Sequence, residues 1–247
     1  MRRGAKENKR RNHFMHMADA LLSPAVGGSM WLLSGAAIAR CSARVRTEAN
    51  DSRTPLMGVL GAFVFAAQMF TFAIPGTGSS GHLCGGTLLA LLLGPHAAFL
   101  TLASVLVVQA LLFGDGGLLA LGCNIFNMAF VTMFVVYPLL FCCLPGALRS
   151  TWRMGAAIVM TAVLSLQLGA LCVALETCLS GISELPLSAF MLLLQPIHLA
   201  MGLVEGGMTL AIVVFVARAR PDIFTGGVLE AIFTAPPQKY GLDQNQM

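Results

Sequence analysis

Long apolar segments alternate with short polar or glycine-rich connections along most of the chain. A helix needs roughly 20 apolar residues to cross the hydrocarbon core of a membrane. By this measure the pattern predicts seven membrane helices, with approximate bounds 26–39, 56–74, 83–93, 97–113, 125–143, 154–175 and 187–217. The first and third are short and border Gly/Pro-rich segments, so we expect tilted or half-inserted helices that line a cavity. The seventh is long enough to need a tilt, or a kink near Pro196.

Composition agrees with this pattern. Hydrophobic residues make up 57% of the 247 residues, charged residues only 11%, and the mean hydropathy is +0.79. A soluble domain carries about 25% charged residues. The chain is therefore predicted to be an all-α, polytopic membrane protein, surrounded by membrane lipid and without a nucleic-acid partner.

Basic residues are confined to a few connections. No Lys or Arg occurs between positions 54 and 148, and the basic residues of the apolar region are Arg40, Arg44, Arg46, Arg53, Arg149, Arg153, Arg218 and Arg220. Short loops rich in Lys and Arg stay in the cytoplasm. This rule places the C-terminal tail, 221–247, in the cytoplasm. It places the start of the membrane domain, the loop at His82 and the 176–184 loop outside.

The first fourteen residues contradict that topology, because they carry Arg2, Arg3, Lys6, Lys9, Arg10 and Arg11. A basic arm of this kind resists export to the outer face. No apolar core typical of a signal peptide follows it directly. Two interpretations remain: the mature chain begins at Met15, or residues 1–14 form a disordered cytoplasmic arm. In both, residues 15–220 form the membrane-embedded domain.

A glycine-rich break at 75–86 places His82 in backbone that we expect to be non-helical. Irregular backbone at membrane depth must be enclosed by protein or a water-filled cavity, so His82 is a candidate metal ligand. If the chain begins at Met15, its amine, the next amide and the His16 imidazole supply three nitrogens, and His82 supplies a fourth. A square-planar nitrogen set favours Ni(II) or Cu(II), with Co(II) as another occupant, whereas zinc prefers a tetrahedron.

Several stretches together resemble the CbiM/NikM family, the membrane substrate-binding components of energy-coupling-factor transporters for cobalt and nickel. They are Met15-His16-Met17-Ala18-Asp19, Gly78-Ser79-Ser80-Gly81-His82-Leu83, Leu112-Phe113-Gly114-Asp115-Gly116-Gly117-Leu118 and Leu121-Gly122-Cys123-Asn124-Ile125-Phe126-Asn127-Met128. The resemblance implies that the amino-terminal loop folds back into the helical bundle. It also implies that the Met15 amine, His16 and His82 are the metal ligands. The extension 1–14 departs from the family's pattern.

The resemblance further implies a set of partners and a location. The partners are a transmembrane coupling subunit, two ATPase subunits and often a small two-helix companion, which we expect here on a separate chain. The protein would be a multi-pass component of a prokaryotic cell membrane, with its metal site facing outside. Ni(II) or Co(II) would be its transported substrate rather than a cofactor, and the chain itself would not be an enzyme.

Two other classes of function fit the sequence less well. An intramembrane metallohydrolase typically needs an H-E-x-x-H helix, and the sequence has no such pair of histidines. A metal-selective channel predicts charged rings or carbonyl filters repeated by symmetry, which a single glycine-rich break does not resemble. The sequence also lacks a G-x-x-x-x-G-K-[ST] motif, so ATP hydrolysis is expected in separate subunits.

Other polar residues have competing interpretations. Asp19 either orients the His16 imidazole as an outer acceptor or caps the first helix near Leu21; Ser80 is a further outer-contact candidate. His198 and Glu205 lie two helical turns apart, and form either a second polar layer or a hydrogen-bonded pair that locks the bundle.

Three further positions, Asp115, Asn124 and Asn127, are predicted to be structural, because they suggest turn and cap chemistry. The Cys84 side chain should point away from His82 if a helix begins at Leu83.

Overall fold

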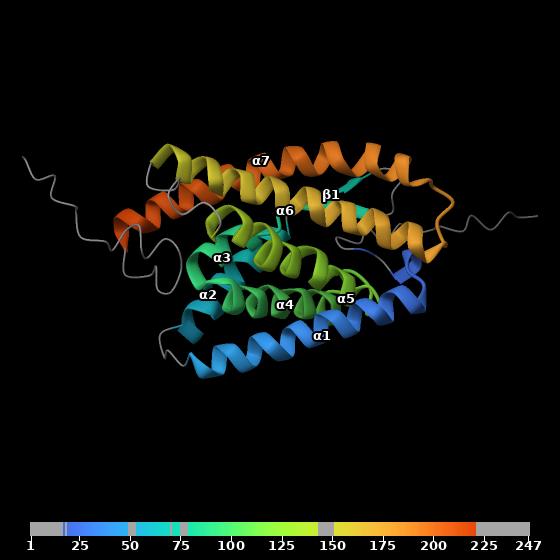
Figure 1. Ribbon diagram of the computed structural model, residues 1–247, viewed down its shortest axis with the longest axis horizontal. Coiled ribbons are helices and arrows are strands. Elements are labelled where there is room, and N and C mark those ends of the chain that lie inside the picture. Colours follow the sequence, from blue (N-terminus) through green and yellow to red (C-terminus); the bar gives the residue numbers. More distant parts are fainter. Residues whose placement is uncertain are drawn as a thin grey trace, which may run out of the picture.

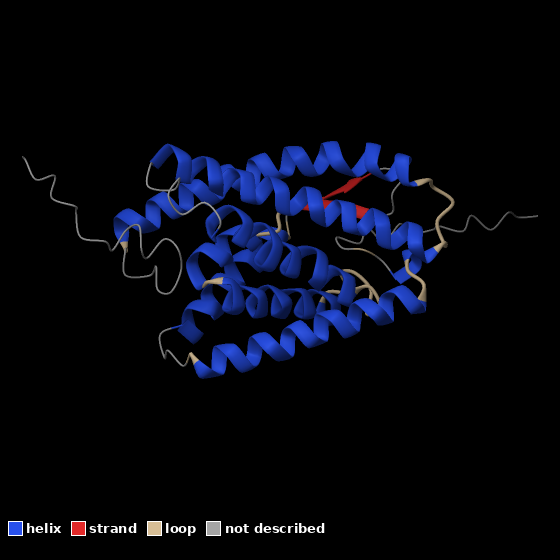
Figure 2. Ribbon diagram, in the orientation of Figure 1, coloured by secondary structure: helices blue, strands red, loops and turns tan. Residues whose placement is uncertain are grey.

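The computed structural model describes residues 17, 19–48, 53–69, 71–74, 79–142 and 151–220. Figures 1 and 2 show an elongated bundle of helices with one short pair of strands. After a short 3-10 turn, η1 (Asp19–Leu21), the helices are α1 (Pro24–Thr47), α2 (Arg53–Gln68), α3 (Gly86–Leu93), α4 (Pro95–Leu112), α5 (Leu121–Asn124), α6 (Thr151–Ser180) and α7 (Leu187–Ala219). The α5 helix continues as π-helical turns, η2 (Ile125–Val136) and η3 (Pro138–Cys142). Strands β1 (Thr71–Ile74) and β2 (Ser79–His82) pair antiparallel.

The predicted helical membrane fold is confirmed. Each of the seven apolar segments contains a helix, and four helical segments in the described part are long and apolar enough to cross a membrane: Pro95–Leu112, Leu121–Phe141, Trp152–Ser180 and Leu187–Ala219. Several predicted bounds were wrong. The first helix is not short, because α1 continues to Thr47 rather than ending near 39, and α6 continues to Ser180 rather than ending near 175. The second segment leaves the helix after Gln68, because Thr71–Ile74 pairs with β2 instead. The third helix begins at Gly86 rather than at 83.

The late start of α3 has a local cause in its N-cap. Gly85 has φ +73°, a left-handed conformation that glycine adopts readily and that a helix cannot continue through. A Cβ at Gly85 would also lie 2.7 Å from Val64 Cγ1. All eight residues of α3 are buried, as expected for a helix that is apolar on every side and lies at the centre of a bundle. Only residues 83–85 separate the strand that ends at His82 from the central helix α3.

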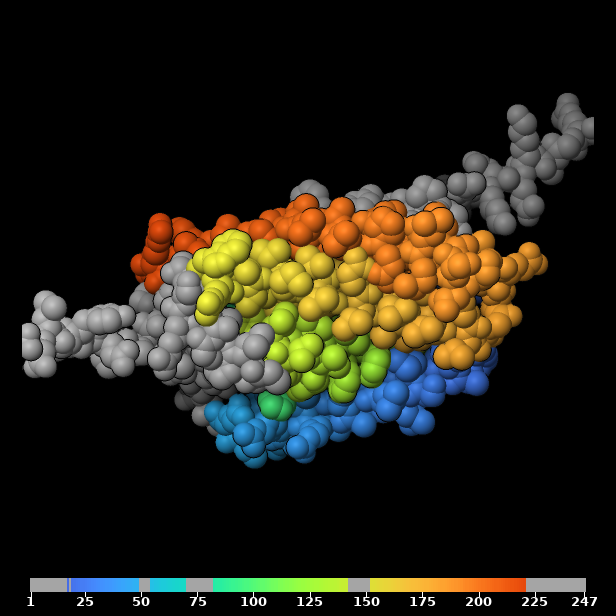
Figure 3. Space-filling view, turned by 45° about the horizontal axis from the view of Figure 1, so that its top comes forward, coloured from blue at the N-terminus to red at the C-terminus, as the bar shows by residue number. Residues whose placement is uncertain are grey.

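The α6 and α7 helices form a closely packed antiparallel pair. Figure 3 shows them side by side on one face, in yellow and in orange to red, with α1 in blue along the opposite edge. Gly202 and Gly206 permit the close approach, because a Cβ at these positions would lie 2.7 Å from Val163 Cα and 2.8 Å from Val159 Cα. Small residues at such contacts let helix backbones meet inside a membrane.

We expect Gly206→Ala to destabilise the protein and Gly207→Ala not to. The alanine methyl at 206 would overlap α6 backbone, whereas nothing lies within 4 Å of a Cβ at the neighbouring position 207. Overpacking of this kind costs about 1–3 kcal/mol, while alanine in place of an unconstrained helical glycine gains up to about 1 kcal/mol. Thermal unfolding of both variants in detergent measures the difference. Equal midpoints would contradict the close contact.

Basic residues near the helix ends gather at one end of the bundle. Arg44 and Arg46 lie in the last turn of α1, Arg218 lies in the last turn of α7, and Arg153 lies at the start of α6. These three helix ends are all at the left of Figure 1. The charge segregation in the sequence thus corresponds to a segregation in space, with the loop between α6 and α7 at the opposite end.

Candidate metal-binding site

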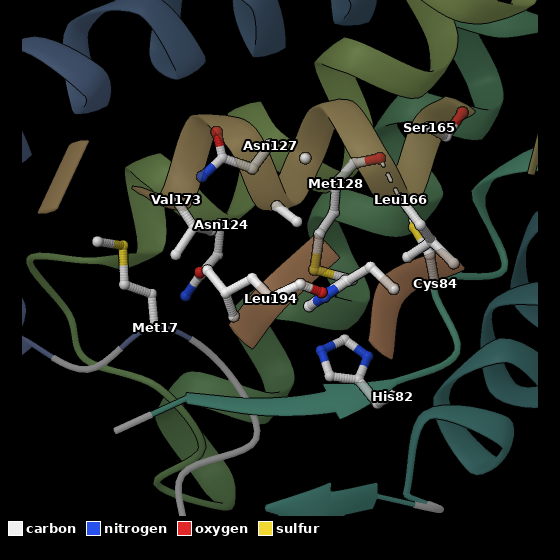
Figure 4. A pocket seen from close by; sticks show the side chains of 13 residues that line it. Met17, His82, Cys84, Asn124, Asn127, Met128, Ser165, Leu166, Val173 and Leu194 are labelled. Atoms are coloured by element: carbon white, nitrogen blue, oxygen red, sulfur yellow. Dashed lines mark hydrogen bonds between the residues drawn. The ribbon is translucent and has the colours of Figure 1, made fainter. Parts of the chain in front are cut away.

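A cavity of about 60 Å³ lies between the N-terminal segment, the end of β2, the α5–η2 helix, α6 and α7 (Figure 4). It has room for roughly two to four water molecules or a small ion with its ligands. Its walls are mainly apolar, with a few polar side chains among them. The residues that line it and that carry the argument below are Met17, His82, Cys84, Asn124, Asn127 and His198.

His82 is the last residue of β2, and its half-buried ring points from the strand into the cavity (Figure 4). The Nδ1 atom lies 2.9 Å from the carbonyl oxygen of Leu83. A carbonyl oxygen only accepts, so Nδ1 carries the proton in this contact and Nε2 carries the lone pair. A backbone carbonyl that fixes the tautomer in this way is the usual outer partner of a metal-binding histidine.

The N-terminal segment is inserted into the bundle. Met17 is 2% exposed and lines the cavity together with His82. The Gly117 N–H donates to the Met17 carbonyl oxygen at 3.4 Å, and the Ala120 N–H donates to Asp19 Oδ1 at 2.8 Å. The inserted loop that the resemblance implied is therefore present from Met17 onward. Met15 and His16 lie outside the described residues.

Asp19 does not cap the first helix. Ser23 is the N-cap of α1 and its Oγ accepts from the Val26 N–H at 3.4 Å, whereas the Asp19 carboxylate bonds to Ala120 in a distant loop. A Cβ at Gly117 would overlap that carboxylate, so the loop needs glycine there. Asp19 thus ties the inserted segment to the 117–120 loop, and its predicted contact with His16 stays a prediction. Ser80 lies in β2, and its side chain is outside the description.

We expect Asp19→Ala to loosen the inserted segment. The variant leaves the Ala120 N–H without its carboxylate acceptor, at a cost of about 1–3 kcal/mol. Amide hydrogen exchange at residues 17–22 and 117–120 should therefore accelerate by about 5- to 160-fold, since 1.36 kcal/mol corresponds to a factor of about ten. Asp19→Asn keeps an acceptor oxygen and should change exchange less. Ser29→Ala, which removes only an exposed intrahelical bond, serves as the control. Parent-like exchange in Asp19→Ala would contradict this role.

His198 and Glu205 are separated rather than paired. His198 Nδ1 lies 2.8 Å from the Leu194 carbonyl oxygen, and its side chain lines the same cavity as His82. Glu205 is 4% exposed and accepts from the backbone N–H groups of Cys84 at 2.7 Å and Gly85 at 3.1 Å. The hypothesis of a hydrogen-bonded His198–Glu205 pair was therefore wrong. The second-layer hypothesis stays a prediction, with only His198 on the cavity wall.

Three polar residues of the site were misplaced by sequence reasoning. Asn124 and Asn127 are neither turn nor cap residues but lie in the α5–η2 helix on the cavity wall. Glu176, expected in an outer loop, lies inside α6 and is 6% exposed. Asn127 Nδ2 donates to Glu176 Oε2 at 2.8 Å. The spacing of Asn124, Asn127 and Met128 was an available signal, because positions i, i+3 and i+4 share one helix face.

Cys84 was also misplaced. It lines the cavity beside His82 because α3 begins at Gly86, and its thiol donates to the Met128 carbonyl oxygen at 3.7 Å. Within the described part of the chain, His, Cys, Asp and Glu side chains form no group of three or more that could hold a metal ion. Of the predicted ligands, the described residues thus include His82. They also include the inserted segment from Met17 onward, which directly follows Met15 and His16 in the sequence.

A helical membrane bundle that encloses an imidazole-lined cavity defines an integral membrane protein with a buried binding site, and comparisons with known proteins identify its family. The family model described as "Cobalt uptake substrate-specific transmembrane region" matches residues 16–223, and the chain belongs to this family. The match covers the membrane domain, including the inserted segment and His82. The family is a metal transporter component rather than an enzyme family.

Relatives and solved structures agree with this family. A protein of Haloquadratum walsbyi named as a metal transport protein is 37% identical over 209 residues, which cover 85% of this chain and 93% of that protein. A fused nickel transport protein, NikMN, of Archaeoglobus fulgidus is 36% identical and is 68% covered, again over 85% of this chain. The cobalt transport protein CbiM of Sorangium cellulosum is 32% identical, with 85% and 94% covered. A crystal structure of a truncated transition metal transporter superposes with a TM-score of 0.75 at 31% identity, covering 83% of this chain and 99% of that one.

Proposed function

We propose that this protein captures Ni(II) or Co(II) at the outer side of a prokaryotic cell membrane for ATP-driven import. One observation carries the proposal: Met17 and His82 line the same cavity. His16 directly precedes Met17, and consecutive Cα atoms are 3.8 Å apart. We therefore propose His16 and Met15, the two residues before Met17 in the sequence, as the partners of His82 at this cavity.

The proposed ligands are the Met15 amine, the His16 amide and imidazole, and His82 Nε2. An amine, an amide and an imidazole from one short segment form fused chelate rings that hold an ion in a plane, and His82 completes a square of nitrogens. Such a set suits Ni(II), and Co(II) accepts the same donors. The cavity of about 60 Å³ is too small for an ion with a full shell of six waters, so the ion must exchange aqua ligands for protein nitrogens on entry.

His198 fits the role of a second imidazole on the wall of the same cavity. Its Nδ1 is fixed by the Leu194 carbonyl, so Nε2 is the nitrogen that carries the lone pair. One imidazole binds an ion far more weakly than a four-nitrogen chelate. An ion that leaves the capture site can therefore meet His198 without being trapped there.

Import requires partners, because four nitrogen ligands hold the ion tightly and release needs work. We infer that the protein assembles with a transmembrane coupling subunit, two ATPase subunits and, on a separate chain, a small two-helix companion. The gathered basic helix ends support a cytoplasmic position for that end of the bundle and for the C-terminus. The names of the relatives, which mention cobalt and nickel transport, support the choice of ions.

Metal content per chain tests the proposal. The chain started at Met15 is purified in detergent after growth with nickel and cobalt, and analysed for both elements. About one Ni or Co per chain is the expected result. In vesicles, the purified chain alone should give no downhill Ni(II) flux, because capture without partners is not transport. A metal-free chain would contradict the capture site, and flux through the chain alone would favour a channel.

A further inference from the structure

Two consecutive peptide groups just beyond Leu83 each have both their carbonyl oxygen and their N–H in contact with a side chain. In the Leu83–Cys84 peptide, the carbonyl oxygen lies 2.9 Å from His82 Nδ1, and the N–H donates to Glu205 Oε2 at 2.7 Å. In the Cys84–Gly85 peptide, the carbonyl oxygen accepts from Gln68 Nε2 at 2.7 Å, and the N–H donates to Glu205 Oε1 at 3.1 Å. The Glu205 carboxylate thus uses a separate oxygen for each peptide.

Gln68 and Glu205 are themselves fixed in place by the packing of their helices. Gln68, on α2, is 1% exposed, and its Oε1 accepts from Gln109 Nε2 of α4 at 2.8 Å. Glu205, on α7, lies between Gly202 and Gly206, the two positions where α7 approaches the α6 backbone closely. The backbone after His82 is therefore connected to three helices of the bundle: α2, α4 and α7.

A buried carboxylate in a membrane helix is costly and persists only with strong partners. Hydrogen bonds from backbone N–H groups to a carboxylate are about twice as strong as those between neutral groups. Hydrogen bonds in series also strengthen one another. A carboxylate that draws on the N–H of the Leu83–Cys84 peptide therefore makes the carbonyl oxygen of the same peptide a better acceptor for the His82 Nδ1–H.

We propose that Glu205 is the positioning residue for His82: its carboxylate orients the Leu83–Cys84 peptide, whose carbonyl orients the imidazole so that Nε2 faces the metal. This inference rests on the proposed function of the cavity. Many metal-binding histidines donate their second ring N–H to a carboxylate. Here one peptide group lies between the carboxylate and the ring. Displacement of α7 relative to α2 and α4 would turn this peptide and move the His82 ring. Motion of the helices would thereby change the coordination of the bound ion.

Glu205→Gln tests the relay in the full protein started at Met15 and loaded with Ni(II). Glutamine has one oxygen and one amide NH₂, so it satisfies only one of the two N–H groups and faces the other with a donor. We expect the variant to bind Ni(II) about 10–100-fold more weakly, the usual cost of losing an outer partner of a ligand. Ni(II) should also dissociate faster to a chelator, and its visible ligand-field absorption should shift, because the ring turns in the square plane.

Two further variants separate positioning from general stabilisation. Gln68→Met removes the bond to the Cys84 carbonyl but leaves the Leu83–Cys84 peptide with both partners, so it should lower thermal stability and leave the Ni(II) spectrum parent-like. Gln195→Ala removes an α6–α7 hydrogen bond away from this backbone and should leave affinity and spectrum unchanged. If Glu205→Gln does not fold, Glu205→Asp, which keeps both oxygens on a shorter side chain, should still show faster Ni(II) release.

The possible results are distinct. Parent-like affinity and spectrum in folded Glu205→Gln, or parent-like release in Glu205→Asp when Gln does not fold, would overturn the positioning role. The same holds if Gln68→Met shifts the spectrum as much as Glu205→Gln. These results would not contradict the proposed capture site as long as the parent protein binds Ni(II). Loss of binding in the parent itself would instead reject the proposed function.

Discussion

His82→Ala should abolish stable binding of Ni(II) and Co(II) while leaving the protein folded. The ring enters the cavity from the end of β2, and its Nδ1–H is held by the Leu83 carbonyl, so that Nε2 is the nitrogen that carries the lone pair. Loss of an outer partner of a ligand already costs about 10–100-fold in metal affinity, and loss of the ligand itself should cost more. Titration with each ion in competition with a chelator measures the affinity.

His96→Ala is the matched control for this variant. His96 is also half-buried, but it lies in the first turn of α4 and packs edge-on against Phe134, 5.6 Å between ring centroids, rather than in the cavity. We expect parent-like affinity in His96→Ala. In His198→Ala we expect a smaller loss than in His82→Ala, because His198 is proposed to meet the ion only after capture. Retention of full affinity in folded His82→Ala would exclude His82 as a ligand.

Loss of the free amine at Met15 should weaken Ni(II) binding to a similar extent. In a chain that begins at Met15, the terminal nitrogen is an amine that releases its proton to a metal. With residues 1–14 retained, the same nitrogen is an amide within the chain, and its lone pair is delocalised into the peptide bond. We therefore expect the chain from Met1 to bind Ni(II) at least about 100-fold more weakly than the chain from Met15, by analogy with the loss of any one ligand. Paired chelator titrations measure the ratio.

A second comparison isolates the amine from the bulk of the arm. N-acetylation of the Met15 chain removes the amine and adds only a small group, so it should reproduce the loss. Binding by the unmodified chain should tighten as pH rises, because the ligands release protons when they bind. Equal affinities for the Met1 and Met15 chains would show that the amine is not a ligand, and the site would then need a donor other than Met15.

The helices and the break at His82 were predictable because their signals are local. Apolar length marks each helix, and glycine and proline mark the break before α3. The pairing of β1 with β2 was not predictable in the same way, because Thr71–Ile74 reads as the apolar end of a helix and becomes a strand only through Ser79–His82. The start of α3 at Gly86 follows from the left-handed conformation of Gly85. The sequence alone does not distinguish Gly85 from the other glycines of this segment.

The partners of buried polar residues were the least predictable part of the site. Glu205 stood out as a carboxylate in an apolar helix, but its partners are backbone N–H groups, which every residue possesses and no sequence distinguishes. Asn127 and Glu176 are 49 positions apart and meet only because η2 packs on α6. Asn127 itself lies on the helix face that Asn124 and Met128 share, so its place on the cavity wall could have been found from spacing.

X-ray absorption at the nickel edge, on the Ni(II)-loaded chain started at Met15, tests the capture site most directly, because it reports the atoms bound to the ion. We predict four nitrogen ligands in a plane, with imidazole scattering in the shell around the ion. A shell that contains sulfur, as Cys84, Met17 or Met128 would supply, or a six-coordinate oxygen shell would contradict it.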